Sequence, residues 1–190
     1  MFLKDIAIIE YSLPVKMRDD VKSNYQSRWL NVSGLMPNNK FVLSENVNSL
    51  DANKALKAES NCILLKRISP TFVNVYEGKD DVCLGTNIIK IKVSDKYDAH
   101  YVGLIIEQNL KFLNNQANNG TRMCAMVRES LECIEIPSRP LAEQKKIGLL
   151  QKLFWEQKDL LEQLIEKQEL KCNTIKGLII DKVGGKQNGN

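Results

Sequence analysis

The stretch IEIPSRPLAEQKKI, residues 134–147, divides the sequence into two parts of different character. Upstream, short apolar runs alternate with Asn, Asp and Gly, and all five prolines of the chain lie there or within the stretch itself. After Pro140 no proline follows, and residues 141–183 are rich in Leu, Ile, Lys, Glu and Gln, which favour helix. Since proline is tolerated in the first turn of a helix, the stretch predicts one long helix that starts at Pro140.

The predicted helix, residues 140–183, is stopped by glycines at 184 and 185 and carries an apolar stripe. The stripe advances in alternating steps of three and four residues, with two successive steps of four around Gln168, as in a coiled coil with one insertion. At about 1.5 Å per residue the helix is a rod of roughly 60 Å. Such a rod outruns the preceding domain, so we expect part of the stripe to contact another helix; the alternative is an amphipathic helix lying on its own domain. The stripe contains Ile147, Leu150, Phe154, Gln157, Leu161, Leu164, Gln168, Cys172, Ile175 and Ile179.

Residues 1–139 show a mixture of patterns that is typical of an α/β domain. Strands are predicted over residues 61–67, 72–76, 86–93 and 131–136, and a short apolar run occupies residues 6–9. The spacing of Val102, Ile105, Ile106 and Leu110 predicts a helix over residues 99–113. The predicted fold is therefore α+β: a mixed α/β domain over residues 1–139, one long C-terminal coiled-coil helix over residues 140–183, and a flexible tail over residues 184–190.

The composition argues against several classes of function. Lys and Arg outnumber Asp and Glu by 27 to 23, and the resulting net charge of +4 is too small to indicate nucleic-acid binding by itself. The five cysteines lack paired spacing, so no metal site is expected, and without a signal peptide or apolar span we expect a cytoplasmic protein that does not contact membranes. Signatures of nucleotide binding and nucleophilic catalysis are absent from the sequence. The single histidine, His100, is interpreted as a partly exposed polar residue, and no catalytic residue is assigned.

Basic residues recur at predicted loops and strand ends. Arg and Lys suit DNA because they neutralise phosphates and can grip the O6/N7 edge of guanine. Arg67 closes a predicted strand and Arg122 follows a polar loop, which makes them the leading candidates, and Tyr25, Trp29 and Tyr76 are aromatic residues that could contact sugars or bases. The candidate DNA-binding residues are Arg18, Lys22, Arg28, Lys66, Arg67, Lys79 and Arg122.

The stretch at residues 134–147 resembles the domain boundary of type I restriction-modification specificity subunits. In that family the last strand of a target recognition domain runs through a proline pair and an Ala-Glu-Gln-Lys signature into a long helix. The opening FLKDIA, residues 2–7, and the closing IKGLII, residues 175–180, with the glycines that follow, are also similar to the family. One departure is EYSLP at residues 10–14, where the family commonly has a glycine-bearing turn.

The resemblance implies a non-catalytic subunit that recognises double-stranded DNA. A full specificity subunit has two recognition domains and two helices, whereas this sequence shows one of each, so the resemblance implies a half-subunit. Such a half would pair with itself or with another half to read a bipartite site. The implied partners are a methyltransferase subunit, which binds S-adenosylmethionine and modifies adenine, and a restriction subunit, which uses ATP; no cofactor is expected on this chain itself. The alternatives are a coiled-coil assembly module whose globular domain binds protein and a small enzyme of unrecognised type.

Overall fold

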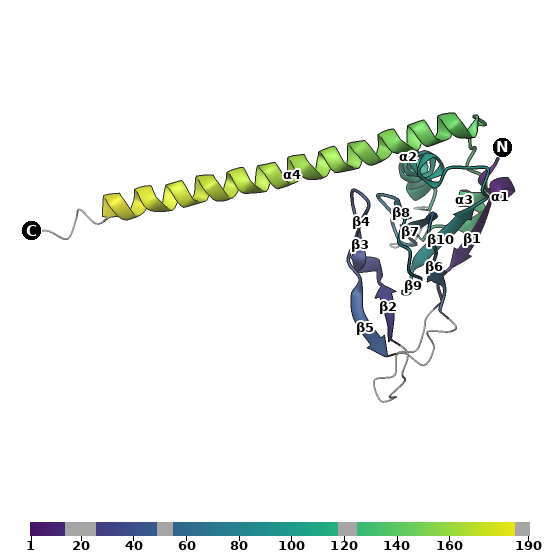
Figure 1. Ribbon diagram of the computed structural model, residues 1–190, viewed down its shortest axis with the longest axis horizontal. Coiled ribbons are helices and arrows are strands. Elements are labelled where there is room, and N and C mark those ends of the chain that lie inside the picture. Colours follow the sequence, from purple (N-terminus) through teal and green to yellow (C-terminus); the bar gives the residue numbers. More distant parts are fainter. Residues whose placement is uncertain (14–25, 49–54, 118–124, 185–190) are drawn as a thin grey trace, which may run out of the picture. The chain divides into compact units, whose positions relative to one another are not determined.

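The computed structural model describes residues 1–13, 26–48, 55–117 and 125–184 (Figure 1). These residues form a mixed α+β domain and one long helix, α4 (Leu141–Gly184), which confirms the predicted fold class. The chain divides into two compact units, Met1–Lys152 and Leu153–Asn190. None of the helices in the described ranges has the length and apolar character that crossing a bilayer requires. The tail predicted over residues 184–190 starts too early, because Gly184 still belongs to α4, and residues 185–190 lie outside the described residues.

The first sheet has four antiparallel strands in the order β1-β10-β7-β8. Its strands are β1 (Ala7–Tyr11), β10 (Ile88–Val93), β7 (Cys62–Lys66) and β8 (Asn74–Tyr76). The strands predicted at residues 61–67 and 86–93 are thereby confirmed, and the one predicted at 72–76 is shorter than expected. Residues 62–65 are all buried, so both faces of β7 are covered, which explains its continuous apolar run.

A second four-stranded sheet, in the order β5-β2-β9-β6, was not predicted from the sequence. Its strands are β5 (Ser44–Asn48), β2 (Gln26–Leu30), β9 (Val82–Leu84) and β6 (Lys57–Ala58). A hairpin of β3 (Leu35–Met36) and β4 (Lys40–Phe41) follows the short 3-10 helix η1 (Val32–Gly34). Asn38 and Asn39 in its turn have φ angles of 58° and 57°, which asparagine tolerates better than most residues. Strands of two or three residues are too short to show alternation in the sequence.

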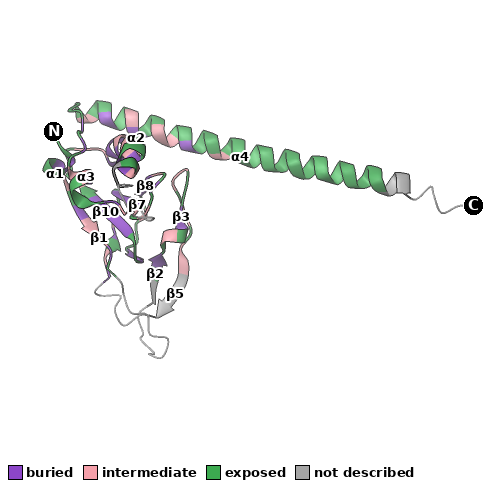
Figure 2. Ribbon diagram, turned by 180° about the vertical axis from the view of Figure 1, so that it is seen from behind, coloured by how far each residue is buried: buried purple, intermediate pink, exposed green. Residues whose placement is uncertain are grey.

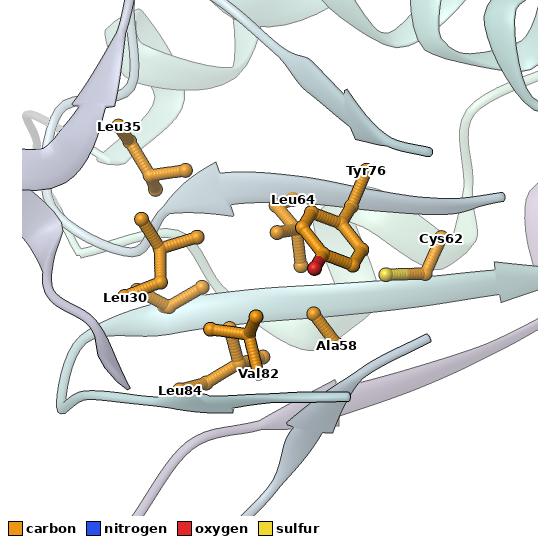
Figure 3. Packing of buried hydrophobic residues seen from close by; sticks show 9 residues of the cluster. Leu30, Leu35, Ala58, Cys62, Leu64, Tyr76, Val82 and Leu84 are labelled. Atoms are coloured by element: carbon orange, nitrogen blue, oxygen red, sulfur yellow. The ribbon is translucent and has the colours of Figure 1, made fainter. Parts of the chain in front are cut away.

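The core lies between the two sheets (Figure 3). Its buried side chains come from strands of both sheets and from the hairpin: Leu30, Leu35, Ala58, Cys62, Leu64, Tyr76, Val82, Leu84 and Ile88. On the opposite face of the first sheet lies α2 (Ala99–Ala117), which contacts β7, β8 and β10 and buries Val102, Ile106 and Leu110. The first sheet is therefore the middle layer of three, held from both sides.

One charged side chain is buried within this arrangement. Lys90 of β10 is 3% exposed, and its Nζ lies 3.1 Å from a carboxylate oxygen of Glu10 and 3.1 Å from one of Glu59. Burial opposes ionisation, but hydrogen bonds to both carboxylates outweigh it and hold the pKa of Lys90 above its ordinary value. The lysine stays charged because it is paired on two sides.

The strand predicted over residues 131–136 is wrong. Residues 128–132 form the helix α3 (Arg128–Glu132), and a single bridge between Phe2 and Glu135 remains of the expected pairing. Around it, the amide of Leu3 donates to the Ile134 carbonyl at 2.8 Å, and the amide of Ile136 donates to the Met1 carbonyl at 2.7 Å. The alternation thus marks an extended segment beside the first residues, just before the short helix α1 (Leu3–Ile6). Pro137 and Pro140 lack the N–H groups that a longer ladder needs.

The root of α4, defined as residues 141–152, packs on the domain with an amide side chain and a glycine as its buried residues. Within this range only Gln144 and Gly148 are buried. The Oε1 of Gln144 accepts the Asp98 amide at 3.0 Å, and its Nε2 donates to the Arg139 carbonyl at 2.8 Å. A Cβ at position 148 would lie 2.3 Å from the Oδ1 of Asp98, so the root and the start of α2 approach as closely as glycine allows.

His100, at the start of α2, is buried rather than partly exposed as predicted, with 5% of its surface accessible. Its Nε2 lies 3.1 Å from the Oε1 of Glu77, which also accepts a hydrogen bond from Lys152 of the root. Burial lowers the pKa of His100, an effect that Glu77 only partly opposes. The prediction failed because burial here comes from the approach of α4, which is distant in the sequence.

We expect Ile88→Ala to lower the free energy of unfolding by about 2–5 kcal/mol, because it empties a fully buried position between the sheets. Ile8→Ala is the matched control: Ile8 is 65% exposed, and its loss should cost less than about 1 kcal/mol. Urea unfolding of both variants measures the difference. Equal losses would contradict the placement of the core.

Candidate nucleic-acid interface

Two arginines lie against one tyrosine ring at the end of the first sheet. The Cζ of Arg67 is 5.5 Å from the ring centroid of Tyr11, and that of Arg128 is 5.7 Å from it. Tyr11 ends β1, Arg67 directly follows β7, and Arg128 begins α3. These three residues are called the Tyr11 cluster below. Guanidinium groups over an aromatic face gain from its quadrupole and keep their N–H donors available.

Backbone contacts hold the cluster in place. The amide of Arg67 donates to the Asn87 carbonyl at 2.8 Å, and the Arg67 carbonyl accepts the Met126 amide at 2.7 Å. Arg128 is fixed through its side chain, because Nη2 donates to the Ile9 carbonyl at 2.6 Å on the outer edge of β1. That bond occupies an acceptor on an edge strand, which would otherwise be open to pairing with another chain.

The electrostatics of the cluster favour an anionic or electron-rich ligand. Burial raises the pKa of Tyr11, although Arg128 and Arg67 oppose the shift, so the phenol is neutral at ordinary pH. The two like charges beside one ring repel each other, and a phosphate or the acceptor edge of guanine would relieve that repulsion. Both arginines are exposed, but Arg128 also lies 3.7 Å from Glu132 and donates to the Ile9 carbonyl. Arg67 is therefore the member of the cluster best placed to contact a ligand.

The other described candidates lie in different surroundings. Lys66 precedes Arg67, but its Nζ lies 5.0 Å from the ring centroid of Phe72. Arg28 on β2 is 3.8 Å from Asp80, and both side chains are largely exposed. Asp80 and the exposed Lys79 come just before β9 in the chain. Asn87, whose carbonyl accepts the Arg67 amide, comes after β9. The structure thus places Lys66 and Arg67 at one end of β9 and Arg28 and Lys79 at the other.

Three predicted basic residues, Arg18, Lys22 and Arg122, and the predicted aromatic Tyr25 lie outside the described residues. Ala125, the first described residue after the gap that contains Arg122, forms a bridge with Ile68, which follows Arg67 in the sequence. Trp29 and Tyr76 cannot serve as aromatic contacts for DNA, since they are only 0% and 6% exposed. Both belong to the interior of the domain.

Tyr11 was not predicted as a site residue from the sequence, and Arg128 was not singled out from the other basic residues near loops. Tyr11 lies only at the end of an apolar run, and Arg128 is one of many basic residues that follow loops. The pairing of β1 with β10 and of β10 with β7 brings the ends of β1 and β7 together. No local signal in the sequence reports that juxtaposition, although an aromatic residue that ends a strand beside a charged strand end is a pattern worth searching for.

A second candidate surface runs along α4. Apart from Asp159, every residue from 156 to 180 is exposed (Figure 2). The predicted stripe is therefore uncovered in the described part of the chain, with Ile147 alone half-buried. The exposed members among the large apolar residues are Leu150 at 53%, Phe154 at 62%, Leu161 at 52%, Leu164 at 54%, Ile175 at 47% and Ile179 at 57%. An apolar surface of this extent marks a contact site for another molecule.

The apolar face of α4 is wider than the predicted stripe. Leu149, Leu153, Leu160 and Leu178 are also exposed and lie beside it on the helix. At about 100° per residue, stripe and flank together cover roughly 160° of the circumference. A two-stranded coiled coil needs only the narrower seam. The face therefore has room for more than one partner helix.

Residues 1–171 match the family model of the type I restriction modification DNA specificity domain, a match that covers the globular domain and most of α4. The chain belongs to this family. No curated protein sequence matches this specificity domain. The family assignment confirms the resemblance seen in the sequence, and it does not favour the alternative of a protein-binding assembly module.

Three solved structures share the fold of the specificity domain. A chain from a study of complex assembly and conformational transition of the type I R-M system aligns with a TM-score of 0.66 at 15% identity, covering 96% of this chain and 44% of that one. The HsdS subunit from Thermoanaerobacter tengcongensis gives 0.60 at 14% identity, over 96% and 43% of the two chains. The S subunit of the type I restriction-modification system from M. genitalium gives 0.56 at 16% identity, over 89% and 42%. The specificity domain thus spans less than half the length of each of these proteins.

We expect Arg67→Ala to weaken binding of the preferred DNA site by about 1–3 kcal/mol if Arg67 reads a guanine, and to weaken other sequences less. Titration of labelled duplexes at fixed salt measures the effect. Arg139→Ala, which removes an exposed arginine paired with Glu143, is the control and should leave affinity unchanged. An equal loss on every sequence would make Arg67 a phosphate contact, and no loss would remove it from the interface.

Proposed function

We propose that the chain acts as one half of the DNA-reading subunit of a type I restriction-modification complex. The observation that carries this proposal is that the family match runs through the globular domain and into α4, whose apolar face is uncovered in the described residues. The domain supplies a rigid frame for basic side chains, and the helix supplies a surface for assembly. Together these are the two parts that a half-subunit needs.

In this proposal residues 1–139 are the target recognition domain and residues 140–183 are the pairing helix. The recognition domain contacts double-stranded DNA with the Tyr11 cluster and with the basic residues predicted from the sequence. Phosphate contacts set orientation and affinity, and a smaller number of base contacts set sequence preference. Affinity should therefore fall steeply as salt concentration rises, because each phosphate contact releases counterions.

The partner helix is supplied by a second copy of the chain or by another half of the same kind. Pairing removes the stripe from water, which provides the driving force for association. Gln157 and Gln168 lie within the stripe and favour one register, since each would be buried without a partner in the others. The two recognition domains would then be held by one shared rod.

The part of the apolar face that the helix pair leaves uncovered supports binding of a further subunit. Leu149, Leu153, Leu160 and Leu178 lie beside the pairing stripe and would stay exposed in a simple helix pair. We assign this flank to the methyltransferase subunit, and a restriction subunit joins the complex that results. Chemistry on the DNA belongs to those partners and their cofactors, and the specificity domain directs them to an address.

Replacing both Leu161 and Leu164 by Asp should convert a dimer into monomers, because unpaired charge in an apolar seam is costly. Light scattering at micromolar concentration measures the change. Asn173→Asp combined with Thr174→Asp adds the same charge on the polar side of α4 and should leave the dimer intact. A wild-type monomer at that concentration would exclude pairing of identical copies.

The DNA site of a homodimer should be an inverted repeat, because a two-fold axis presents the same recognition domain twice. If the helices run antiparallel, as the family resemblance implies, about 60 Å of helix limits the half-site centres to roughly 18 base pairs apart at about 3.4 Å per pair. The bases between the half-sites go unread, whereas adding one pair rotates a half-site by about 35° and should reduce binding.

Selection of bound fragments from a random DNA library, with the methyltransferase subunit present, tests this proposal. Two inverted half-sites around a spacer of free sequence and constant length are the expected result. A single continuous asymmetric motif would exclude the homodimer and identify a different half-subunit as the partner. If the bound fragments share no sequence motif, the proposed function is overturned.

A further inference from the structure

The root of α4 contacts the domain through polar, directional bonds. The residues Gln144, Gly148 and Lys152 lie four apart, so they form one row along the root of the helix. Gln144 is held by the Asp98 amide on one side and by the Arg139 carbonyl on the other, as described above. An apolar interface tolerates small rotations, but hydrogen bonds of this kind specify one orientation.

Gly148 adds a steric limit to the same row. A side chain there would meet the Oδ1 of Asp98 at 2.3 Å and the Cβ of His100 at 3.0 Å. Asp98 cannot simply turn aside, because its Oδ1 accepts the Tyr101 amide at 2.9 Å in the first turn of α2. The glycine therefore sets how closely the root approaches the domain.

Lys152 completes the row through Glu77, which follows β8. The carboxylate of Glu77 accepts a hydrogen bond from Lys152, and the same Oε1 lies 3.1 Å from the Nε2 of His100. Partial burial of Glu77 opposes its ionisation, yet the contacts with Lys152 and His100 outweigh it and keep the pKa of Glu77 below its ordinary value. One carboxylate thus joins β8, the start of α2 and the root of α4.

The root also contains the half-buried Leu141 and Ile147, and Trp155 just beyond it is buried as well. A cavity of about 400 Å³ lies between the root and the domain, lined by residues of both, among them Asp98, Lys145 and Lys152. Because packing leaves this space unfilled, the hydrogen bonds and the close approach made by the row contribute directly to the orientation of the root. Loss of one contact of the row should change the orientation of the domain on the root without unfolding the domain.

We propose that Gln144, Gly148 and Lys152 form a mount that holds the recognition domain at one angle on the root of α4. This mount determines which distance between two DNA half-sites the paired protein accepts. The inference rests on the proposed function and deepens it. The three residues and their partner Glu77 are positioning residues, since they act on DNA through the placement of the domain and not by touching it.

Two variants of the full chain test the mount, Gly148→Ala and Glu77→Gln, each with a matched control. Gly177→Ala adds the same methyl group on the same helix where nothing lies within 4 Å, and Glu135→Gln removes one charge from an exposed carboxylate. All four are assembled with the methyltransferase subunit and offered a library of two half-sites separated by spacers of varied length. Thermal unfolding checks that each variant is folded.

The controls and the wild type should select one spacer length. Gly148→Ala and Glu77→Gln should shift the preferred spacer by one or more base pairs or bind neighbouring lengths equally well, while the half-site sequence is unchanged. Loss of stability alone cannot imitate this result, because it weakens binding at every spacer length in the same proportion. Should Gly148→Ala fail to fold, Glu77→Gln decides, since its site is partly exposed.

Folded variants that keep the wild-type spacer preference would overturn the mount and leave the proposed function in place. If the wild type itself selects no paired half-sites, the proposed function fails, and the mount fails with it. These two results are distinguished by the wild-type selection alone.

Discussion

The approach of α4 to the start of α2 at Gly148 is the constraint on which the use of the other parts depends. In the proposed function, a domain that reads DNA and a helix that assembles a complex act together only if one is held at a defined angle to the other. The glycine permits an approach at which Gln144 and Lys152 also reach the domain. With any larger residue at this position, the polar contacts above and below it would have to lengthen or rearrange.

The layered domain serves the same requirement for rigidity at the other end. Because α2 covers one face of the first sheet and the second sheet covers the other, the strand ends of the middle layer cannot move independently. Tyr11 and Arg67 are placed by those strand ends, and Arg128, at the start of α3, is tied to β1 by its bond to the Ile9 carbonyl. Side chains held in this way lose little conformational freedom on binding, which favours selectivity over simple attraction to charge.

The sequence predicted the parts of this molecule that depend on local pattern. The helix after Pro140, the strands β7 and β10, and the helix α2 were all visible as periodicity or continuous apolar runs. Short strands such as β6 and β9 were not, because two or three residues cannot show a period. The segment at residues 131–136 was misread because its alternation records burial beside residues 1–3 and not membership of a sheet.

Sites assembled from distant segments were predicted least well. Arg67 was identified because it ends a strand, but its neighbours Tyr11 and Arg128 come from positions 56 and 61 residues away in sequence, which only the sheet order brings together. His100 was judged from its local surroundings as partly exposed, whereas α4 and Glu77 enclose it. The functional meaning of the joint came from its resemblance to a family, since spacing and composition alone indicate only a helix boundary.

The uncovered face of α4 has a consequence for the amount of protein that a cell can maintain. A newly made copy displays a broad apolar surface until a partner covers it, and such surfaces recruit chaperones, proteases or unrelated proteins. We expect unpartnered copies to be removed faster than assembled ones. The amount of partner helix would then limit the number of assembled recognition subunits. DNA sites would be bound only to the extent that partner subunits are present to act on them.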